Sequence, residues 1–227
     1  DGTFDTGRAV FEAPTFPNLA FETVGDFDDD GVSEALMRHA LTGDLTAMQV
    51  VGGGFGSESL YGGATDDLID GQDGDDKIFA GDGHDLLLGD SDDDFIQAGD
   101  GDDSVDGGND DDSLFGGQGR DVLQGNDSED DLFGGADDDT LLAGNGTDIL
   151  DGGEGDDFLQ AGSFGFDHLR GGDGDDILQG IGDRSAMEGG AGDDRIYGGS
   201  SLDVLFGGDG DDYIVGGLSA DTLYGGS

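Results

Sequence analysis

An acidic residue recurs at a fixed spacing through about three quarters of this 227-residue chain. From Gly53 onward the sequence divides into nineteen units, eighteen of nine residues and one of ten. The sixth place of the unit is Asp in seventeen units, Glu at residue 58 and Ser at residue 185. Carboxylates at regular intervals offer the hard oxygen donors that Ca²⁺ prefers. We therefore expect rows of cation sites rather than one isolated site.

Short strands must position these acids. The eighth place is Leu, Ile, Val or Met in every unit, two residues after the acid. The first six places, G-G-x-G-x-D, predict a turn, because glycine tolerates positive φ and close backbone approach. Places seven to nine predict a three-residue strand whose middle side chain points inward. Such a strand is stable only when stacked on copies of itself, so two units form one 18-residue coil.

The units "GGDGDDILQ" (171–179), "GGEGDDFLQ" (152–160) and "GGDGDDYIV" (207–215) resemble the G-G-x-G-x-D-x-U-x nonapeptide of RTX (hemolysin-type calcium-binding) proteins. The resemblance covers 53–227. The predicted fold is all-β: a right-handed parallel β-roll solenoid with two short-stranded parallel sheets and a small N-terminal β cap. The resemblance also implies Ca²⁺ between the turns of stacked coils, and an extracellular or cell-surface location, reached by type I secretion from a Gram-negative bacterium.

Alternate units lie on opposite edges of such a roll. Edge A holds the units that begin at residues 53, 71, 89, 107, 125, 143, 161, 180, 198 and 216, and edge B those that begin at 62, 80, 98, 116, 134, 152, 171, 189 and 207. The resemblance implies that the sixth-place Asp side chains and turn carbonyls hold the ions. The carboxylates on edge B are Asp67, Asp85, Asp103, Asp121, Asp139, Asp157, Asp176, Asp194 and Asp212, and those on edge A are Asp76, Asp94, Asp112, Asp130, Asp148, Asp203 and Asp221. The turn glycines of edge B are Gly81, Gly83, Gly99, Gly101, Gly117, Gly119, Gly153, Gly155, Gly172, Gly174, Gly190, Gly192, Gly208 and Gly210.

The fourth place differs between the edges. Edge B has Gly there almost throughout, as at Gly101, whereas edge A more often has Asp or Ser, as at Asp110. We predict a nearly complete row of Ca²⁺ on edge B and a thinner one on edge A, with gaps at Ser185 and at the extra residue near Phe164. The alternative is that the fourth place is merely tolerant and that both rows fill.

Calcium should be needed for folding. Stacked carboxylates about 4.8 Å apart repel by about 1 kcal/mol for each neighbouring pair even in water. One aliphatic side chain for every nine residues makes a core too thin to offset this repulsion and the ordering of so many glycines. We expect a disordered calcium-free chain that folds on binding Ca²⁺.

The composition supports cations as partners. Seven Lys and Arg against 56 Asp and Glu give a net charge of −49, which disfavours nucleic acids and anionic membranes. The absence of Cys excludes disulfides and thiolate metal sites. No apolar stretch is long enough to span a membrane. Because the sequence lacks an initial Met and a signal peptide, we expect a piece of a larger protein, or a product exported without an N-terminal signal.

Residues 1–52 have a different character from the repeats and form a predicted β cap or the tail of a preceding domain. The stretch 24–50 resembles one FG-GAP/VCBS-type repeat, a calcium loop followed by a hairpin. The predicted loop ligands are Asp26, Asp28, Asp30, the carbonyl of Val32, and Glu34. A strand, a turn at 42–44 and a second strand are expected to follow.

The ninth place on edge A is often aromatic: Tyr61, Phe79, Phe115, Phe133, Phe206 and Tyr224. Strand propensity alone would explain this pattern. The alternative is an exposed stripe that packs against another domain or another copy of the chain, and the C-terminal end of the roll could also self-associate.

We find no catalytic constellation in the sequence. His39, His84 and His168 are scattered, and the sequence lacks the G-x-S-x-G and H-E-x-x-H motifs and a Cys nucleophile. Two roles follow. The chain is a calcium-binding structural module of an adhesin or surface-layer type of protein, serving as rigid spacer or assembly surface, or it is the C-terminal secretion and folding region of an RTX protease, lipase or epimerase whose catalytic domain lies elsewhere.

Overall fold

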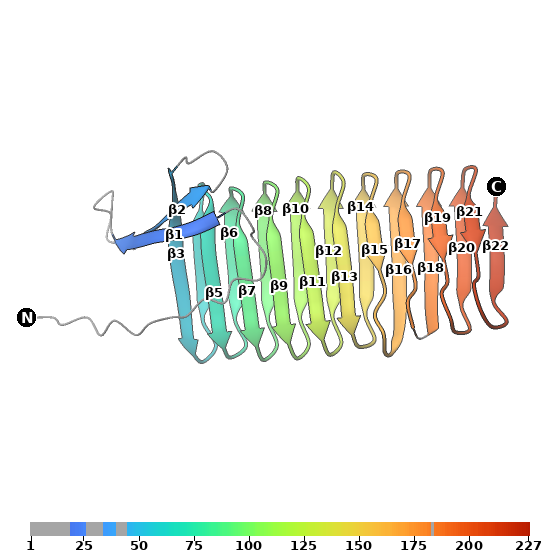
Figure 1. The fold of residues 1–227 in the computed structure, drawn as a ribbon, viewed down its shortest axis with the longest axis horizontal. Coiled ribbons are helices and arrows are strands. Elements are labelled where there is room, and N and C mark those ends of the chain that lie inside the picture. Colours follow the sequence, from blue (N-terminus) through green and yellow to red (C-terminus); the bar gives the residue numbers. More distant parts are fainter. Residues whose placement is uncertain (1–18, 26–33, 40–44, 183) are drawn as a thin grey trace, which may run out of the picture.

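The protein is described by a computed structural model that covers residues 19–25, 34–39, 45–182 and 184–227, with side chains from Val51 onward. Every regular element in this part of the chain is a β-strand. The strands stack into an elongated roll along which the chain advances coil by coil (Figure 1). A membrane-spanning helix is not found among the described residues.

Two sheets form the roll, and from β3 onward successive strands alternate between them. The twelve-stranded sheet contains, in spatial order, β1 (Leu19–Gly25), β2 (Glu34–His39), β3 (Leu45–Phe55), β5 (Asp67–Asp73), β7 (Leu86–Ser91), β9 (Ser104–Asn109), β11 (Val122–Asp127), β13 (Thr140–Asn145), β15 (Phe158–Gln160), β17 (Ile177–Gln179), β19 (Arg195–Tyr197) and β21 (Tyr213–Val215). The ten-stranded sheet contains β22 (Thr222–Gly226), β20 (Val204–Asp209), β18 (Arg184–Ala191), β16 (Phe166–Asp173), β14 (Ile149–Glu154), β12 (Asp131–Ala136), β10 (Ser113–Gln118), β8 (Phe95–Asp100), β6 (Lys77–Asp82) and β4 (Ser59–Gly63). From β3 and β4 onward the pairing within each sheet is parallel, which confirms the predicted two-sheet solenoid.

Most strands of the roll are longer than predicted. β10 has six residues, the seventh to ninth places of one unit and the first three of the next. The prediction of a six-residue turn was therefore wrong for units whose first three residues belong to a strand. In these units the turn occupies only places four to six. The reason is that each residue has a counterpart one coil away, so that pairing continues past the aliphatic position. Gly117, for example, pairs with both Gly99 and Gly135.

The eighth-place side chains form a single core between the sheets. From Ile69 to Leu205 each of them is at most 2% exposed. The first place of the unit faces the same interior and is Gly or Ala, as at Ala98, which is fully buried. Gly is the usual residue there because a Cβ atom would crowd the sixth-place carboxylate of the same unit and the backbone carbonyl of the next coil.

The N-terminal strands extend the twelve-stranded sheet. β2 pairs antiparallel with β1 and β3, and β3 then pairs in parallel with β5. The two strands predicted after the calcium loop are therefore present. β3 runs through residue 52, where we expect the cap to end and the roll to begin. The loop ligands Asp26, Asp28, Asp30 and Val32, the turn 42–44 and the side chain of Glu34 lie outside the described part of the chain.

The strand lengths change from the ten-residue unit 161–170 onward. β15, β17, β19 and β21 of the twelve-stranded sheet have the three residues that the sequence predicted. β16 and β18 of the ten-stranded sheet have eight residues instead of six. The two edges therefore no longer have equivalent backbones in this part of the roll.

Candidate metal centres

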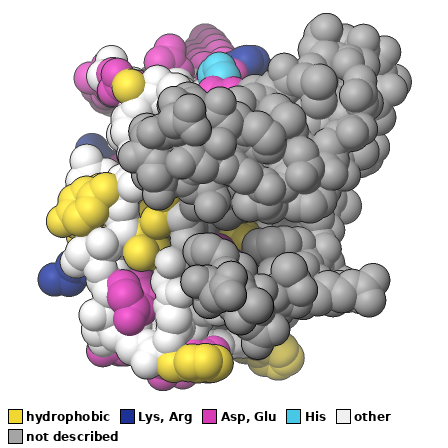
Figure 2. Space-filling model, turned by 90° about the vertical axis from the view of Figure 1, so that its left-hand side faces the viewer, with side chains coloured by type: hydrophobic (Ala, Val, Ile, Leu, Met, Phe, Trp, Pro, Cys, Tyr) yellow, Lys and Arg dark blue, Asp and Glu magenta, His cyan; other side chains and the backbone are white. Residues whose placement is uncertain are grey.

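Most sixth-place residues belong to the turns that join the two sheets at the edges of the roll (Figure 1). In a view along the roll, the described Asp and Glu side chains appear mainly at the top and bottom (Figure 2). Those of the sixth place are nevertheless turned inward, with Asp112 2% and Asp121 1% exposed. A carboxylate buried to this degree needs a compensating partner.

One oxygen of each buried carboxylate has a partner within the chain. The Asp112 N–H donates to Asp130 Oδ1 over 2.9 Å, and the Asp121 N–H donates to Asp139 Oδ1 over 2.8 Å, one coil away in each case. The same bond repeats along edge B from Asp67 to Asp212, and along edge A from Glu58 to Asp167 and from Ser185 to Asp221. The backbone of one coil thus fixes the direction of the carboxylates of the next.

The second carboxylate oxygen, Oδ2, is buried and accepts no hydrogen bond from any described residue at thirteen positions. These are Asp85, Asp94, Asp103, Asp112, Asp121, Asp130, Asp139, Asp148, Asp157, Asp176, Asp194, Asp203 and Asp212. A buried charged oxygen without a partner costs several kcal/mol in general, so the same defect would not persist at every turn without a compensating group. A cation along each edge would be such a group.

Backbone carbonyls lie beside these oxygens. A Cβ atom built on Gly198 would lie 2.7 Å from Asp203 Oδ2 and 2.6 Å from the carbonyl oxygen of Gly216, one coil on. The glycine therefore keeps open a place where a carboxylate and a carbonyl oxygen converge. Carboxylate and carbonyl oxygens are the donors that Ca²⁺ takes in proteins, so these residues fit the ion that the sequence implies.

The fourth place of the turn shows a similar convergence. A Cβ atom on Gly83 would lie 2.7 Å from both Asp85 Oδ1 and the Thr65 carbonyl oxygen of the preceding coil. This geometry belongs to the glycine turns of edge B that the sequence nominated. It agrees with the implied use of turn carbonyls as ligands.

Two backbone conformations with positive φ occur at the fourth place. Eight glycines adopt φ between 111° and 152°, as at Gly101 (143°), whereas five Asp and Ser residues adopt φ between 70° and 91°, as at Asp110 (70°). The first group is Gly74, Gly83, Gly101, Gly119, Gly155, Gly174, Gly192 and Gly210, and the second is Asp92, Asp110, Ser128, Asp137 and Ser219. The fourth-place Gly56, Thr65, Gly146 and Ser201 belong to neither group. All but Gly74 of the first group lie on edge B, and all but Asp137 of the second lie on edge A. The sequence difference between the edges thus has a counterpart in turn geometry, while their unequal occupancy stays a prediction.

Burial shifts the titration of the rows. It raises the pKa of Asp112 and Asp139 to about 8 and that of Asp121 and Asp130 to about 7. Loss of hydration is the largest cause; the N–H bond from the neighbouring coil opposes it, and adjacent carboxylates add to it. A divalent cation would favour the charged form instead, so that its binding would release protons.

The donors are distributed along the roll. No three His, Asp or Glu side chains gather into a metal-binding group anywhere in the described ranges. Each turn contributes one sixth-place carboxylate beside backbone carbonyls, so the candidate centres lie between coils. His84 and His168 are exposed, as predicted from their places in the unit.

The aromatic side chains predicted for one stripe lie on the ten-stranded sheet in two separate groups, because Asp151, Arg170 and Glu188 occupy the ninth places between them. Phe206 and Tyr224 form one group, with ring centroids 4.7 Å apart.

In the other group, Tyr61 and Phe79 stack with ring centroids 5.4 Å apart, and Phe115 and Phe133 stack at 4.9 Å. Between these pairs lies Phe95, 5.8 Å from Phe79 and 5.3 Å from Phe115. The sequence analysis missed Phe95 because it occupies the seventh place. The signal was available, since seventh and ninth places project from the same face of a strand.

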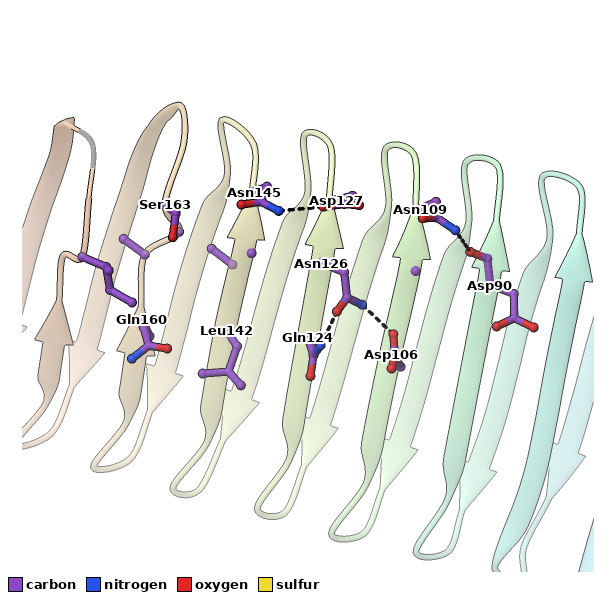
Figure 3. Close-up of a pocket in the computed structure, with 16 residues that line it drawn as sticks. Asp90, Asp106, Asn109, Gln124, Asn126, Asp127, Leu142, Asn145, Gln160 and Ser163 are labelled. Atoms are coloured by element: carbon purple, nitrogen blue, oxygen red, sulfur yellow. Dashed lines mark hydrogen bonds between the residues drawn. The ribbon is translucent and has the colours of Figure 1, made fainter. Parts of the chain in front are cut away.

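The outer face of the twelve-stranded sheet carries amides and carboxylates that line a shallow groove (Figure 3). Asn126 Nδ2 donates to Asp106 Oδ1 over 2.6 Å, and Asn145 Nδ2 donates to Asp127 Oδ1 over 2.7 Å. These bonds link neighbouring coils. Sequence analysis did not single out these residues. Asp106, Asp127 and Asn145 occupy third and ninth places, which have no fixed residue type, and Asn126 replaces the usual second-place Gly.

Comparison with family models gives one result. A model described as the RTX calcium-binding nonapeptide repeat, in four copies, matches residues 52–87, 88–123, 124–159, 161–180, 187–214 and 199–227. The matched ranges agree with the region 53–227 in which the sequence shows the resemblance. Between 52 and 227 they leave out only residue 160 and residues 181–186. A search of curated proteins finds no match.

Proposed function

The chain belongs to the family of RTX calcium-binding nonapeptide repeats, and from this premise we propose that it is an extracellular structural module that folds when calcium binds. The observation that carries the proposal is the pair of rows of buried carboxylates at the two edges. In thirteen of these carboxylates Oδ2 accepts no hydrogen bond from a described residue. Calcium held by these oxygens and by turn carbonyls supplies the positive charge that the rows lack.

The dependence of folding on calcium follows from the electrostatics. Without cations, the rows of each edge place like charges on adjacent coils, and burial adds the cost of dehydration. The chain can reduce this cost by protonation or by unfolding. Calcium removes it without either, and because the sites exist only between stacked coils, the binding free energy contributes directly to folding.

Circular dichroism tests this proposal. The chain is expected to lack β-structure in excess EDTA at pH 7.5 and to gain it when millimolar CaCl₂ is in excess over the chelator. MgCl₂ at equal ionic strength is the control, because Mg²⁺ requires a stricter octahedral shell and should induce much less structure. An unchanged spectrum on adding calcium would contradict the proposal.

The module is proposed to serve a secreted or cell-surface protein as a rigid spacer or assembly surface. The even stacking of coils along the roll suits a spacer, because each coil contacts mainly its neighbours.

We also propose that catalysis is not performed by this chain. Sequencing of the full-length gene tests both statements. An adhesin-like or surface-layer context supports the spacer, whereas an adjacent catalytic domain would assign the roll to secretion and folding of an enzyme.

Self-association through the aromatic stripe is the proposed partner interaction. The stripe is defined by Tyr61, Phe79, Phe95, Phe115 and Phe133. The first and third residues of the five strands that carry it include one Lys and one Asp as their only charged side chains. In a chain of net charge −49, this face is one on which a like-charged second copy can rest.

The extent of the stripe indicates a weak contact. Four steps between neighbouring strands give a length of about 19 Å, which is short for a stable interface. We expect a concentration-dependent dimer in sedimentation experiments with calcium, which Phe115→Ser together with Phe133→Ser should abolish. The matched control is Phe158→Ser on the opposite sheet. Dimerisation that persists in the stripe variant would contradict this interface.

A further inference from the structure

One unit of the roll departs from the others at two places at once. In the unit 180–188, Ser185 is the only Ser at the sixth place and Met187 is the only Met at the eighth. Both side chains are 1% exposed. The Ser185 N–H still donates to Asp203 Oδ1 over 2.9 Å, so the backbone keeps the register of the other turns while the carboxylate is missing.

The methionine occupies the space that a carboxylate takes elsewhere. A Cβ atom on the first-place Gly198 would meet Asp203 Oδ2 at 2.7 Å. At the equivalent Gly180, the nearest side-chain atom is Met187 Cε, also at 2.7 Å. A methyl group therefore lies where other units place an oxygen. A thioether methyl cannot bind a hard cation such as Ca²⁺.

The turn carbonyl of this unit is also engaged within the chain. Ser200 Oγ and Ser201 Oγ both donate to the carbonyl oxygen of Gly182, over 3.0 Å and 2.6 Å. One coil further on, Ser219 Oγ donates in the same way to the carbonyl oxygen of Ser200, over 2.9 Å. In this stretch of edge A, serine hydroxyls thus donate hydrogen bonds to turn carbonyl oxygens. A carbonyl oxygen without such a donor would be available to bind a cation instead.

The preceding turn on edge A shows a related substitution. In the ten-residue unit 161–170, the Gly162 N–H donates to Asp167 Oδ2 over 3.0 Å. At thirteen other turns the equivalent oxygen accepts no hydrogen bond from a described residue. The extra residue of this unit therefore gives the carboxylate a second backbone partner. The family model independently leaves out residues 181–186, which lie in the unit that contains Ser185.

We propose that edge A carries no calcium at the two consecutive turns that contain Asp167 and Ser185, because backbone N–H, hydroxyl and methyl groups of the chain itself replace the ion there. The inference rests on the proposed calcium binding at the other turns. It divides the edge A row into one run that ends at Asp148 and another that begins at Asp203. Edge B binds calcium in this part of the roll as well, because its row of carboxylates continues without interruption through Asp157, Asp176 and Asp194.

Native mass spectrometry of the full chain in calcium tests the proposal by counting ions on each molecule. Ser185→Ala should leave the count unchanged. Ser185→Asp combined with Met187→Leu restores the common residues and should add at least one ion. The matched inverse is Asp130→Ser combined with Leu132→Met, which transfers the same pair of residues to a regular edge A unit and should remove at least one ion.

Each result bears on the proposal separately from calcium binding itself. A lower count in Ser185→Ala, or a folded Ser185→Asp/Met187→Leu variant with an unchanged count, would overturn it. If that double variant does not fold, Ser185→Ala still decides. Ser200→Ala with Ser201→Ala should lower the melting temperature without changing the count, and a lost ion in this variant would also overturn the inference. A wild-type chain that binds no calcium would instead refute the proposed function.

Discussion

The Asp103 N–H donates a hydrogen bond of 2.8 Å to Asp121 Oδ1 in the next coil, while Oδ2 of that carboxylate is buried and accepts no hydrogen bond from any described residue. One oxygen is therefore used to set the position of the carboxylate and the other remains for a ligand. The two functions are separated within one side chain, so they can be tested by substitutions that change one oxygen and keep the other.

Asp121→Asn keeps an acceptor for the Asp103 N–H but removes the charge. We expect the variant to lose most of the calcium stabilisation from its site, about 2.7 kcal/mol at a calcium concentration 100 times the dissociation constant of that site. Urea unfolding in calcium measures this loss. Asp102→Asn is the control, because Asp102 is exposed and pairs with exposed Arg120. Equal losses in the two variants would show that Asp121 has no special role.

Exchanging the fourth-place residues of one coil tests the difference between the edges. Gly101 has φ 143° and Asp110 has φ 70°. Gly101→Asp should destabilise the calcium-bound roll by about 1–3 kcal/mol, because the native φ suits only glycine. Asp110→Gly should raise calcium affinity on edge A despite a backbone entropy cost of up to about 1 kcal/mol. Calorimetric titration measures both, and unaltered affinity in both variants would favour two equivalent edges.

Neighbouring residues of β11 allow a test of the core. Leu123 is fully buried between the sheets, and Val122 beside it is 43% exposed. Leu123→Ala should cost about 2–5 kcal/mol of unfolding free energy in calcium, because it leaves a cavity in a core one side chain thick. Val122→Ala should change it by less than about 0.5 kcal/mol. Similar values in thermal unfolding would be inconsistent with the observed side-chain directions.

In the absence of calcium, lower pH should stabilise the folded roll relative to the unfolded chain. Burial raises the pKa of Asp103 to about 6 and that of Asp112 to about 8, from an ordinary value of 3.8. A group with a raised folded-state pKa contributes stability below its unfolded pKa, and this contribution is lost as the pH rises through its folded pKa. We therefore expect more β-structure at pH 5 than at pH 8 in calcium-free buffer, measured by circular dichroism.

When calcium is present, the pH dependence of folding should reverse, because protons compete with the ion for the same carboxylates. The calcium concentration at the midpoint of folding should rise when the pH falls from 8 to 5. Sodium chloride at a fixed concentration controls for screening. A calcium-free chain that is more structured at pH 8 than at pH 5 would contradict the assigned burial of the carboxylates.

The sequence was sufficient to predict the repeat, the core and the rows of acids. An aliphatic residue such as Leu123 and an acid such as Asp121 recur two places apart in nearly every unit. A unit with one inward side chain cannot bury it alone, so stacking follows from the repeat itself. Residue type and spacing therefore fixed which side chains point inward, and the structure confirms this from Ile69 to Leu205.

Other features depended on contacts between coils. The six-residue length of β10, the hydrogen bond from the Asp103 N–H to Asp121 Oδ1, and the contact between Phe95 and Phe115 all involve residues eighteen or more positions apart. Likewise, Ser185 reads in the sequence as a missing acid, and only the packing of Met187 against Gly180 indicates that its turn is filled by an apolar group. The sequence by itself determined the periodic positions, because a repeat places like residues together. Only the tertiary structure decided how each interior space between coils is filled, because atoms from neighbouring coils meet there.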